Sequence, residues 1–277
     1  MVMPLNLLPD IVFSADVATR NDASLGLIAN ERDYMSTWLT TSRNLWRILG
    51  GTSSLMTLPD DIERKIGADI LICVRGPLHS KYLFIEAKRY KTKFDSLKNP
   101  SPAAVANFGI PTAPKISRFT DQIVRQAAHL AIHPNHVIYE MFLHMENTVP
   151  PLPYQQFGST LVSHSTVRNV FPPVGARSPY NVWNMGDVTP LVGMNPSLSI
   201  KEILSEVIAC NLGNPYSNYE LPFGLLNPIY NFEEARQILY ALGIRHFVSF
   251  DGMFPWEPED YDRRIGNDRP PIDGRLE

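Results

Sequence analysis

The chain has few cysteines and no long apolar run, and these two absences argue against a disulfide-rich protein and against a membrane-spanning one. Its 277 residues include two cysteines, Cys73 and Cys210, which lie far apart in apolar segments. Isolated thiols of this kind are typical of buried free cysteines in a reducing compartment, and they argue against a disulfide-stapled secreted domain. No apolar stretch approaches the roughly 18–20 residues that span a bilayer, and the start lacks the basic region of a signal peptide. We therefore expect a cytoplasmic protein with no membrane segment.

The sequence also lacks the motifs that would assign a function directly. It contains no Gly-rich phosphate loop, no nucleophile elbow and no Cys-x-x-Cys pair. Its formal net charge of −3 provides no general attraction for a polyanion, so nucleic-acid binding would need a local basic patch. The apolar content of 44% and the charged content of 19% are ordinary for a folded protein. A chain of this length can form one large core, or a core with a modest appendage.

Hydrophobic periodicity gives the first half of the chain a regular pattern. Residues 1–20 look irregular, whereas apolar residues recur at helical spacing from Asp22 to Gly50. The next predicted elements are strands at 53–58, 68–74 and 81–90, a loop at 92–117, a helix at 118–132 and a strand at 136–145. The strands are almost continuously apolar, which indicates a sheet covered on both faces. This order predicts an α/β fold built as a layer sandwich.

The second half is rich in Pro, Gly and Asn and is harder to interpret. It contains one plausible strand at 159–167, two helices with capping-box sequences at Ser199–Leu212 and Asn231–Leu242, a strand at 244–250 and a polar tail from Asp251. We predict a core domain at residues 1–146. The remainder, residues 147–277, is predicted to form an irregular α/β extension that packs on this core.

The most informative segment runs from Gly67 to Lys91. It places Asp69 on one predicted strand and Glu86 and Lys88 on the next. Strand side chains alternate between faces, so Glu86 and Lys88 point the same way and Ala87 points to the opposite layer. Two acids and an ammonium on one sheet face are costly to bury unless a divalent cation lies between them. An ordinary ion pair between Glu86 and Lys88 at a strand end is the alternative.

This pattern resembles the PD-(D/E)XK superfamily, whose members share a restriction-endonuclease-like fold with a mixed sheet flanked by helices. The resemblance covers about residues 22–143, and it departs from the family in that Asp69 follows Gly-Ala where the family often has Pro. It implies that Asp69, Glu86 and the Ala87 carbonyl hold Mg²⁺ or Mn²⁺, a hard cation that prefers oxygen ligands. It also implies that Lys88 orients or deprotonates the attacking water.

Three further polar residues are candidates for the same site. Glu31 lies among apolar helix neighbours, and in several branches of the superfamily an acid of the first helix reaches the metal. The alternative is a glutamate that extends to water at the edge of this face. Gln122 and Gln126 share a helix face, and RecB-like members place a glutamine on this helix. Gln126 looks the better inward candidate, although a merely polar helix face explains both residues equally well.

Two weaker features lie near the motif. Glu63 precedes the Asp69 strand and fits a solvated turn charge better than a metal ligand. His129 and His133 are four residues apart on one helix, but no third ligand accompanies them and Pro134 ends the helix. Their position fits the preference of cations for helix C-termini better than it fits a zinc site.

Basic residues cluster around the motif although the protein as a whole is acidic. The predicted contacts with a phosphate backbone are Arg89, Lys91, Lys93, Arg118 and Arg125, with Lys98 and Lys115 nearby and Tyr90 and Phe94 interleaved. A local excess of this kind suits an approaching polynucleotide, and a charged solvated loop is the alternative.

The resemblance therefore implies a Mg²⁺-dependent nuclease that acts on DNA in preference to RNA, in bacterial or phage defence or in DNA processing. Many members of the superfamily are homodimers. Two other hypotheses remain open. The chain could be a nuclease fold without turnover that binds nucleic acid or protein, or a structural protein of an assembly such as a phage particle.

Overall fold

The computed structural model describes the chain in eight stretches, namely residues 3–58, 66–89, 95–109, 114–145, 158–171, 175–193, 199–217 and 232–255. The strands in these stretches are β1 (Thr52–Thr57), β2 (Ile70–Arg75), β3 (His79–Arg89), β4 (Leu97–Lys98), β5 (Ile116–Ser117), β6 (Val137–Leu143), β7 (Thr160–Ser163), β8 (Tyr216–Ser217) and β9 (His246–Asp251). The helices are a short 3₁₀ turn (Leu5–Leu7), α1 (Leu8–Ser24), α2 (Glu31–Ile48), α3 (Pro102–Phe108), α4 (Arg118–Ile132), α5 (His164–Arg168), α6 (Met185–Gly193), α7 (Ile200–Ile208) and α8 (Phe232–Leu242).

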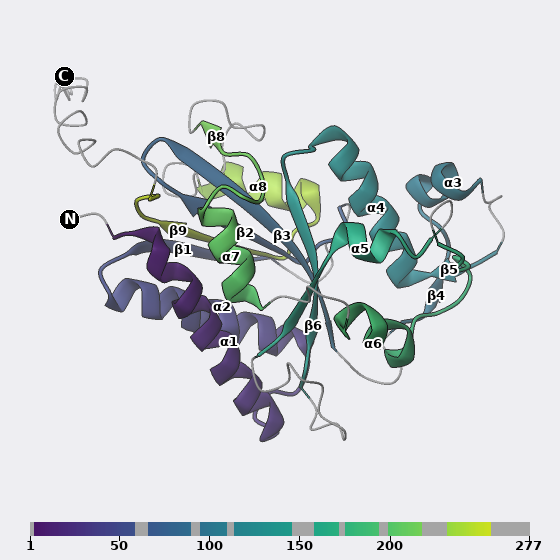
Figure 1. Ribbon diagram of the computed structural model, residues 1–277, viewed down its shortest axis with the longest axis horizontal. Helices are drawn as coiled ribbons and strands as arrows, with labels where there is room; N and C mark the ends of the chain where they lie inside the picture. Colours follow the sequence, from purple (N-terminus) through teal and green to yellow (C-terminus); the bar gives the residue numbers. More distant parts are fainter. Residues whose placement is uncertain are drawn as a thin grey trace.

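A mixed sheet forms the centre of the α/β fold (Figure 1). Within the described stretches it has seven strands in the order β1-β9-β2-β3-β6-β7, with β8 paired to β3 outside this path. β2 and β3 form an antiparallel hairpin, and β6 runs parallel to β3 after the α4 crossover. A separate two-stranded sheet joins β4 and β5.

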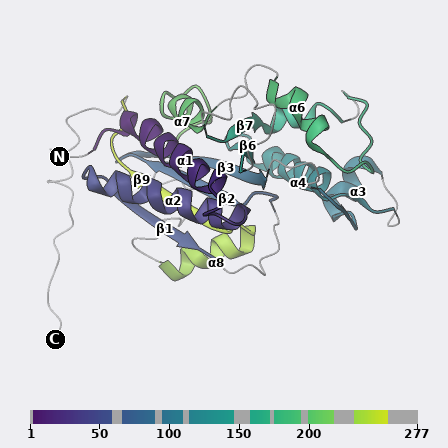
Figure 2. The same ribbon diagram turned by 90° about the horizontal axis from the view of Figure 1, so that it is seen from below.

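Helices cover both faces of the sheet, as its apolar strands predict. Residues of α1, α2 and α7 pack on the face that carries Ile70, Ile72 and Ile85. The opposite face, with Leu71 and Phe84, is covered by α8 and by the end of α4. Figure 2 shows α7 and α8 on opposite sides of the strands. A further apolar cluster joins α4, α5 and α6 beside β6 and β7.

The prediction of an irregular start was wrong, because residues Leu8–Ser24 form helix α1. Leu8, Ile11, Val12 and Ala15 are buried at helical spacing on one side of this helix. The first helix therefore begins earlier in the chain than the apolar spacing predicts.

The single helix predicted from Asp22 to Gly50 is also wrong, since the chain turns between α1 and α2. Gly26 has a φ of +77°, and Leu25 and Leu27 are 74% and 73% exposed. Asn30 then caps α2 by accepting a hydrogen bond from the Asp33 amide at 3.0 Å. The apolar spacing thus continued through a turn that the sequence does not mark strongly.

Later elements agree more closely with the sequence. Helix α4 has the predicted bounds, and the Ser199–Glu202 capping box of α7 is confirmed, although α7 ends at Ile208. Helix α8 is also confirmed, while its predicted cap Asn231 lies outside the described residues. Three predictions need correction. The loop at 92–117 contains α3 and the short strands β4 and β5, the strand at 159–167 gives way to α5 after Ser163, and Cys210 is exposed although Cys73 is buried as expected.

The sheet does not follow the predicted boundary at residue 146. β9 lies between β1 and β2, antiparallel to the first and parallel to the second. β7 extends the other side of the sheet by pairing with β6. Elements of residues 147–277 therefore complete the sheet of residues 1–146, because β1 has no neighbour within the sheet other than β9 in the described stretches.

We expect a shortened chain ending at residue 146 to lack a cooperative fold. It would leave the edge strand β1 and the buried strand β2 without the partner between them, and each missing ladder exposes apolar side chains and backbone groups. Urea unfolding followed by circular dichroism measures this. Residues 147–277 co-expressed as a second piece should restore a cooperative transition. A cooperative transition from residues 1–146 alone would contradict the argument.

Candidate active site

Three carboxylates lie in a row across the middle of the sheet. Glu86 of β3 is in register with Glu140 of β6. The Ile70–Ile85 pair of the β2–β3 hairpin places Asp69 opposite Glu86, and the Asp69 amide donates to the Ile85 carbonyl at 2.9 Å. Residues in register on neighbouring strands share a face. All three side chains are fully buried, so the fold brings the two predicted acids together and adds a third.

Lys88 and Gln122 both contact Glu86. The Lys88 ammonium donates to Glu86 Oε1, which also accepts a hydrogen bond from Gln122 Nε2 at 2.6 Å. The ammonium lies 5.8 Å from the centroid of the Phe119 ring. Its side chain is 11% exposed and is the part of this group that reaches the surface. The predicted placement of Glu86 and Lys88 on one sheet face is thus confirmed, and the ion pair that was the alternative explanation for this pattern is also present.

Gln126 has a positioning role one helical turn further along α4. Its Nε2 donates to the Gly67 carbonyl at 2.7 Å, and its Oε1 lies 2.8 Å from His164 Nδ1. The sequence favoured Gln126 over Gln122 as the inward residue. Both glutamines are buried, and Gln122 is the one bonded to a predicted ligand.

Gly67 allows α4 to approach the start of β2. Its φ is +82°, and a Cβ at this position would lie 2.7 Å from the Gln122 carbonyl oxygen. Any side chain would therefore push α4 away from the sheet, and with it the glutamine that contacts Glu86. The close approach of α4 thus explains why a glycine precedes Ala68 and Asp69, which the sequence pattern alone did not show.

Asp69 and Glu31 take over the hydrogen bonding of β3 where β2 has no residues to pair with it. Asp69 Oδ2 accepts from the Ala87 amide at 3.2 Å, and Glu31 Oε2 accepts from the Arg89 amide at 3.0 Å. These donors are two residues apart on one strand, which separates them by roughly 7 Å. Glu31 is the first residue of α2 and is partly buried. The structure thus places it near Asp69, at the end of β3.

The Ala87 carbonyl faces the same side of the strand as its amide. In a strand, the N–H and C=O of one residue point toward the same neighbour. Because the Ala87 amide binds the Asp69 carboxylate, its carbonyl is directed past the start of β2, toward the Asp69 side. This orientation is compatible with the predicted role of Ala87 as a backbone ligand.

Glu140 is the site residue that the sequence analysis missed. Within the described residues, neither of its carboxylate oxygens accepts a hydrogen bond, and both are buried. Burial and the neighbouring Glu86 charge raise the pKa of Glu140 well above its ordinary value, and the Lys88 ammonium and nearby Gln126 amide oppose this only in part. A lone acid within the apolar run of residues 136–145 was the available signal.

Of the residues predicted to contact phosphate, some are exposed, some already form ion pairs, and the others lie outside the described residues. Arg118 is exposed at the start of α4, whereas Arg125 forms an ion pair with the buried Asp121 at 3.1 Å. Lys98 binds the same carboxylate at 2.8 Å. Although burial acts to raise it, these cations and Ser101 hold the pKa of Asp121 below its ordinary value. Arg125 and Lys98 therefore already have a partner for their charge.

Other predicted residues are placed differently or not described. Arg89 is partly buried, and its guanidinium donates to the Ala29 carbonyl at 3.4 Å. Lys91 and Lys93, with Tyr90 and Phe94 beside them, lie outside the described residues, as does Glu63.

The carboxylate row has the donor chemistry that a hard divalent cation requires. Asp69, Glu86 and Glu140 supply oxygen ligands, and the two buried Glu140 oxygens lack hydrogen-bond donors among the described residues. In those stretches, no group of three or more His, Cys, Asp or Glu side chains is spaced as a ready-formed metal site. Mg²⁺ commonly binds through one or two carboxylates and keeps several waters, so this row fits it with fewer than three protein carboxylates.

The helical histidine pair belongs to a three-histidine cluster outside this site. His129 Nε2 lies 2.8 Å from His136 Nδ1, and the His133 ring stacks on His136 with centroids 5.0 Å apart. Burial, with the neighbouring imidazoles, lowers the pKa of His129 to about 4 and that of His136 to about 3. His129 and His136 are thus held in their neutral form at neutral pH, unlike the helix-terminal cations that the sequence suggested.

We expect this cluster to make the protein sensitive to acid. A histidine with a folded pKa below its unfolded value binds protons more strongly when unfolded, so its contribution is present above pH about 6.5 and is lost as the pH falls to about 3–4. Urea unfolding between pH 7 and pH 4 measures the decline in the free energy of unfolding. His136→Phe should make that decline shallower, and an unchanged slope would contradict the assignment.

Comparisons with known proteins provide no functional assignment for this chain. No family model matches the chain, and no curated protein or solved structure matches it. Across the described stretches, none of the helices has the length and apolar character needed to cross a membrane.

Proposed function

We propose that this protein is a divalent-metal-dependent nuclease of the restriction-endonuclease-like type, with DNA as its substrate. The observation that carries the proposal is the row of Asp69, Glu86 and Glu140 with Lys88 on the same sheet face. The β2–β3 hairpin and the parallel strand β6 supply this face, and helix α4 lies between β3 and β6 in the chain. Burying three acids with one ammonium is unfavourable by itself, which supports a functional reason for keeping them.

Each residue of the row has a distinct part in this proposal. Asp69 and Glu86, with the Ala87 carbonyl, would hold Mg²⁺ or Mn²⁺, and Glu140 would add negative charge beside the ion without being required as a ligand. When bound, the ion supplies charge neutralisation at the phosphoryl oxygens and a more acidic water. Lys88 would orient that water through its ammonium, which lies against Glu86, and it would take the proton of the water only as the neutral amine, after losing its own proton. Gln122 holds the Glu86 carboxylate, and Gln126 holds the Gly67 turn.

Burial of the row favours a second candidate function. Asp69, Glu86 and Glu140 have no exposed surface, and the Lys88 side chain is 11% exposed. A phosphodiester can reach such a row only after the cover over it moves. A nuclease fold without turnover, which binds nucleic acid or takes part in an assembly, needs no such movement. Metal-dependent cleavage separates the two candidates.

The substrate and the setting are the finer parts of the proposal. Exposed Arg118 is available for a phosphate contact near the row. The preference for DNA over RNA, a role in defence or DNA processing and a homodimeric state depend on the superfamily resemblance.

We expect the wild-type chain to cleave plasmid or single-stranded DNA with Mg²⁺ or Mn²⁺ and to be inactive in EDTA. Lys88→Ala should reduce the rate by about 10²–10⁴-fold, the range for loss of a general acid–base group. Lys201→Ala is the matched control, because Lys201 is an exposed lysine that pairs with Asp10 on the surface. Gel-based single-turnover assays measure the rates. Equal rates for wild type and Lys88→Ala would exclude this mechanism.

Glu140→Gln should lower cleavage and raise stability at the same time. A folded pKa above the unfolded one means that the wild type loses stability as the pH rises above the ordinary carboxyl range, because the buried charge must form. The neutral amide removes that cost. We expect a higher free energy of unfolding than wild type at pH 8 in EDTA, and a smaller difference at pH 5.

The control for this substitution is Glu233→Gln, at an exposed glutamate of α8 that pairs with Arg236. It should change neither cleavage nor the pH dependence of unfolding. Normal cleavage together with unchanged stability in Glu140→Gln would remove Glu140 from the site.

A further inference from the structure

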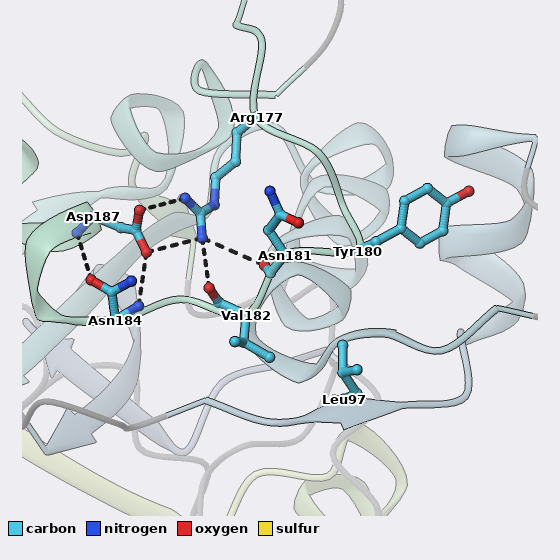
Figure 3. A pocket seen from close by; sticks show the side chains of 7 residues that line it. All are labelled: Leu97, Arg177, Tyr180, Asn181, Val182, Asn184 and Asp187. Atoms are coloured by element: carbon cyan, nitrogen blue, oxygen red, sulfur yellow. Dashed lines mark hydrogen bonds and ion pairs between the residues drawn. The ribbon is translucent and has the colours of Figure 1, made fainter.

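A surface hollow lies beside the N-terminal end of α4, outside the carboxylate row. Its volume is about 420 Å³, within the usual range for small-ligand sites. Four of its lining residues are Leu97, Tyr180, Asn181 and Val182. Figure 3 shows the Tyr180 ring pointing away from the polar group that forms the other end of the hollow.

That polar end is a rigid frame centred on Arg177. The guanidinium binds both oxygens of Asp187, at 2.7 and 3.1 Å, and donates to the Val182 carbonyl at 3.0 Å. It also lies 4.1 Å from the ring centroid of the buried Trp183. Asn184 caps α6 by accepting from the Gly186 amide at 2.8 Å. The internal contacts of these residues explain their presence without a ligand.

The remaining lining residues have no comparable structural explanation. Tyr180, Leu97 and Val182 are 42%, 49% and 38% exposed, so an aromatic ring and two aliphatic side chains gather at one solvent-facing hollow. Asn181 is exposed as well, and its side-chain amide forms no hydrogen bond with a residue that the structure describes. An open aromatic face beside a free amide is a combination suited to a flat, polar-edged ligand.

The backbone connects this hollow firmly to α4. Ser117, the cap of α4, donates from its amide to the Pro179 carbonyl at 3.1 Å and pairs with Leu97. Asp95 accepts hydrogen bonds from the Ser117 hydroxyl at 2.6 Å and from the Trp183 amide at 2.8 Å. Gln122, which binds Glu86, follows Ser117 by five residues, or about 7.5 Å along the helix axis. About one and a half turns of α4 therefore connect the hollow to the carboxylate row.

Positive charge lies next to this connection. Arg118 directly follows Ser117, and both Arg118 and Lys115 are exposed. Among the described residues, neither side chain has an ion pair that would compensate its charge. These two cations can therefore contact a phosphate group close to the hollow, and this provides charge complementarity to a polynucleotide.

We propose that the hollow binds one unstacked nucleobase of a single-stranded nucleic acid, beside the strand segment that enters the carboxylate row. Tyr180 stacks on the base between the aliphatic side chains, Asn181 hydrogen-bonds to its edge, and Arg118 contacts an adjacent phosphate. Base–aromatic stacking is tolerant of sequence, whereas an amide on a base edge discriminates between bases. This inference rests on the proposed function, because it names the substrate class of the same protein.

The experiment measures the binding of fluorescein-labelled 12-mers of dA, dC, dT and U to the full chain in EDTA, where no metal-dependent cleavage occurs. Tyr180→Ala should weaken the binding of every oligonucleotide by roughly 5- to 150-fold, and Tyr180→Phe should retain it. Asn181→Ala should reduce the differences between bases more than it reduces the average affinity. Tyr240→Ala is the matched control, because Tyr240 is a 54% exposed tyrosine on α8.

A second measurement does not depend on substitutions. Photocrosslinking of an oligonucleotide that carries 5-iododeoxyuridine should attach to the peptide containing Tyr180. Equal affinities of wild type and Tyr180→Ala, absence of oligonucleotide binding, or crosslinks that map only elsewhere would each overturn the inference. The dT and U arms show whether the strand is DNA or RNA.

The outcomes separate this inference from the proposed nuclease activity. Cleavage by the wild type together with normal binding by Tyr180→Ala would refute the base site and leave the nuclease proposal intact. Tyr180-dependent binding without metal-dependent cleavage would support the base site and favour a nuclease fold without turnover.

Discussion

The register of three neighbouring strands is the constraint on which the rest of this structure depends. β2, β3 and β6 are aligned so that Asp69, Glu86 and Glu140 occupy one buried row. Like charges at such short range in a dry interior raise one another's cost of ionisation, and one ammonium does not neutralise three acids. Shifting a strand by one residue would send its acid to the opposite face, among the apolar side chains under α1 and α2. The site and the sheet alignment are therefore one property of the fold.

Helix α4 connects the parts of the molecule that matter for function. Its side chains reach Glu86 and Gly67, its cap is tied to the 179–183 segment through Asp95, and its far end carries His129. The close approach that Gly67 permits keeps this helix against the sheet. One continuous helix thus connects these contacts to the carboxylate row.

The stability of the sheet and the composition of the site act in opposite directions. β9 lies inside the sheet, where it contributes apolar side chains such as Phe247, Val248 and Phe250 to both faces. Glu140 places a buried carboxylate, with no hydrogen-bond partner among the described residues, at the same depth. Proteins often keep such unfavourable groups at functional sites while the surrounding core stabilises the fold. This contrast is the physical basis for regarding the row as a site.

The amino-acid sequence by itself determined the local part of this description. Period-two alternation set Glu86 and Lys88 on one face, strong amphipathic spacing gave α4 its bounds, and Ser199 with Glu202 specified a capping box. These features depend on neighbours a few residues apart, so a sequence displays them directly.

Only the tertiary structure decided which distant segments meet. It paired Glu140 with Glu86, inserted β9 between β1 and β2, and placed Glu31 against the end of β3. Strand order and register follow from the packing of whole layers, and residues that are far apart in the chain share no local pattern that would indicate their contact.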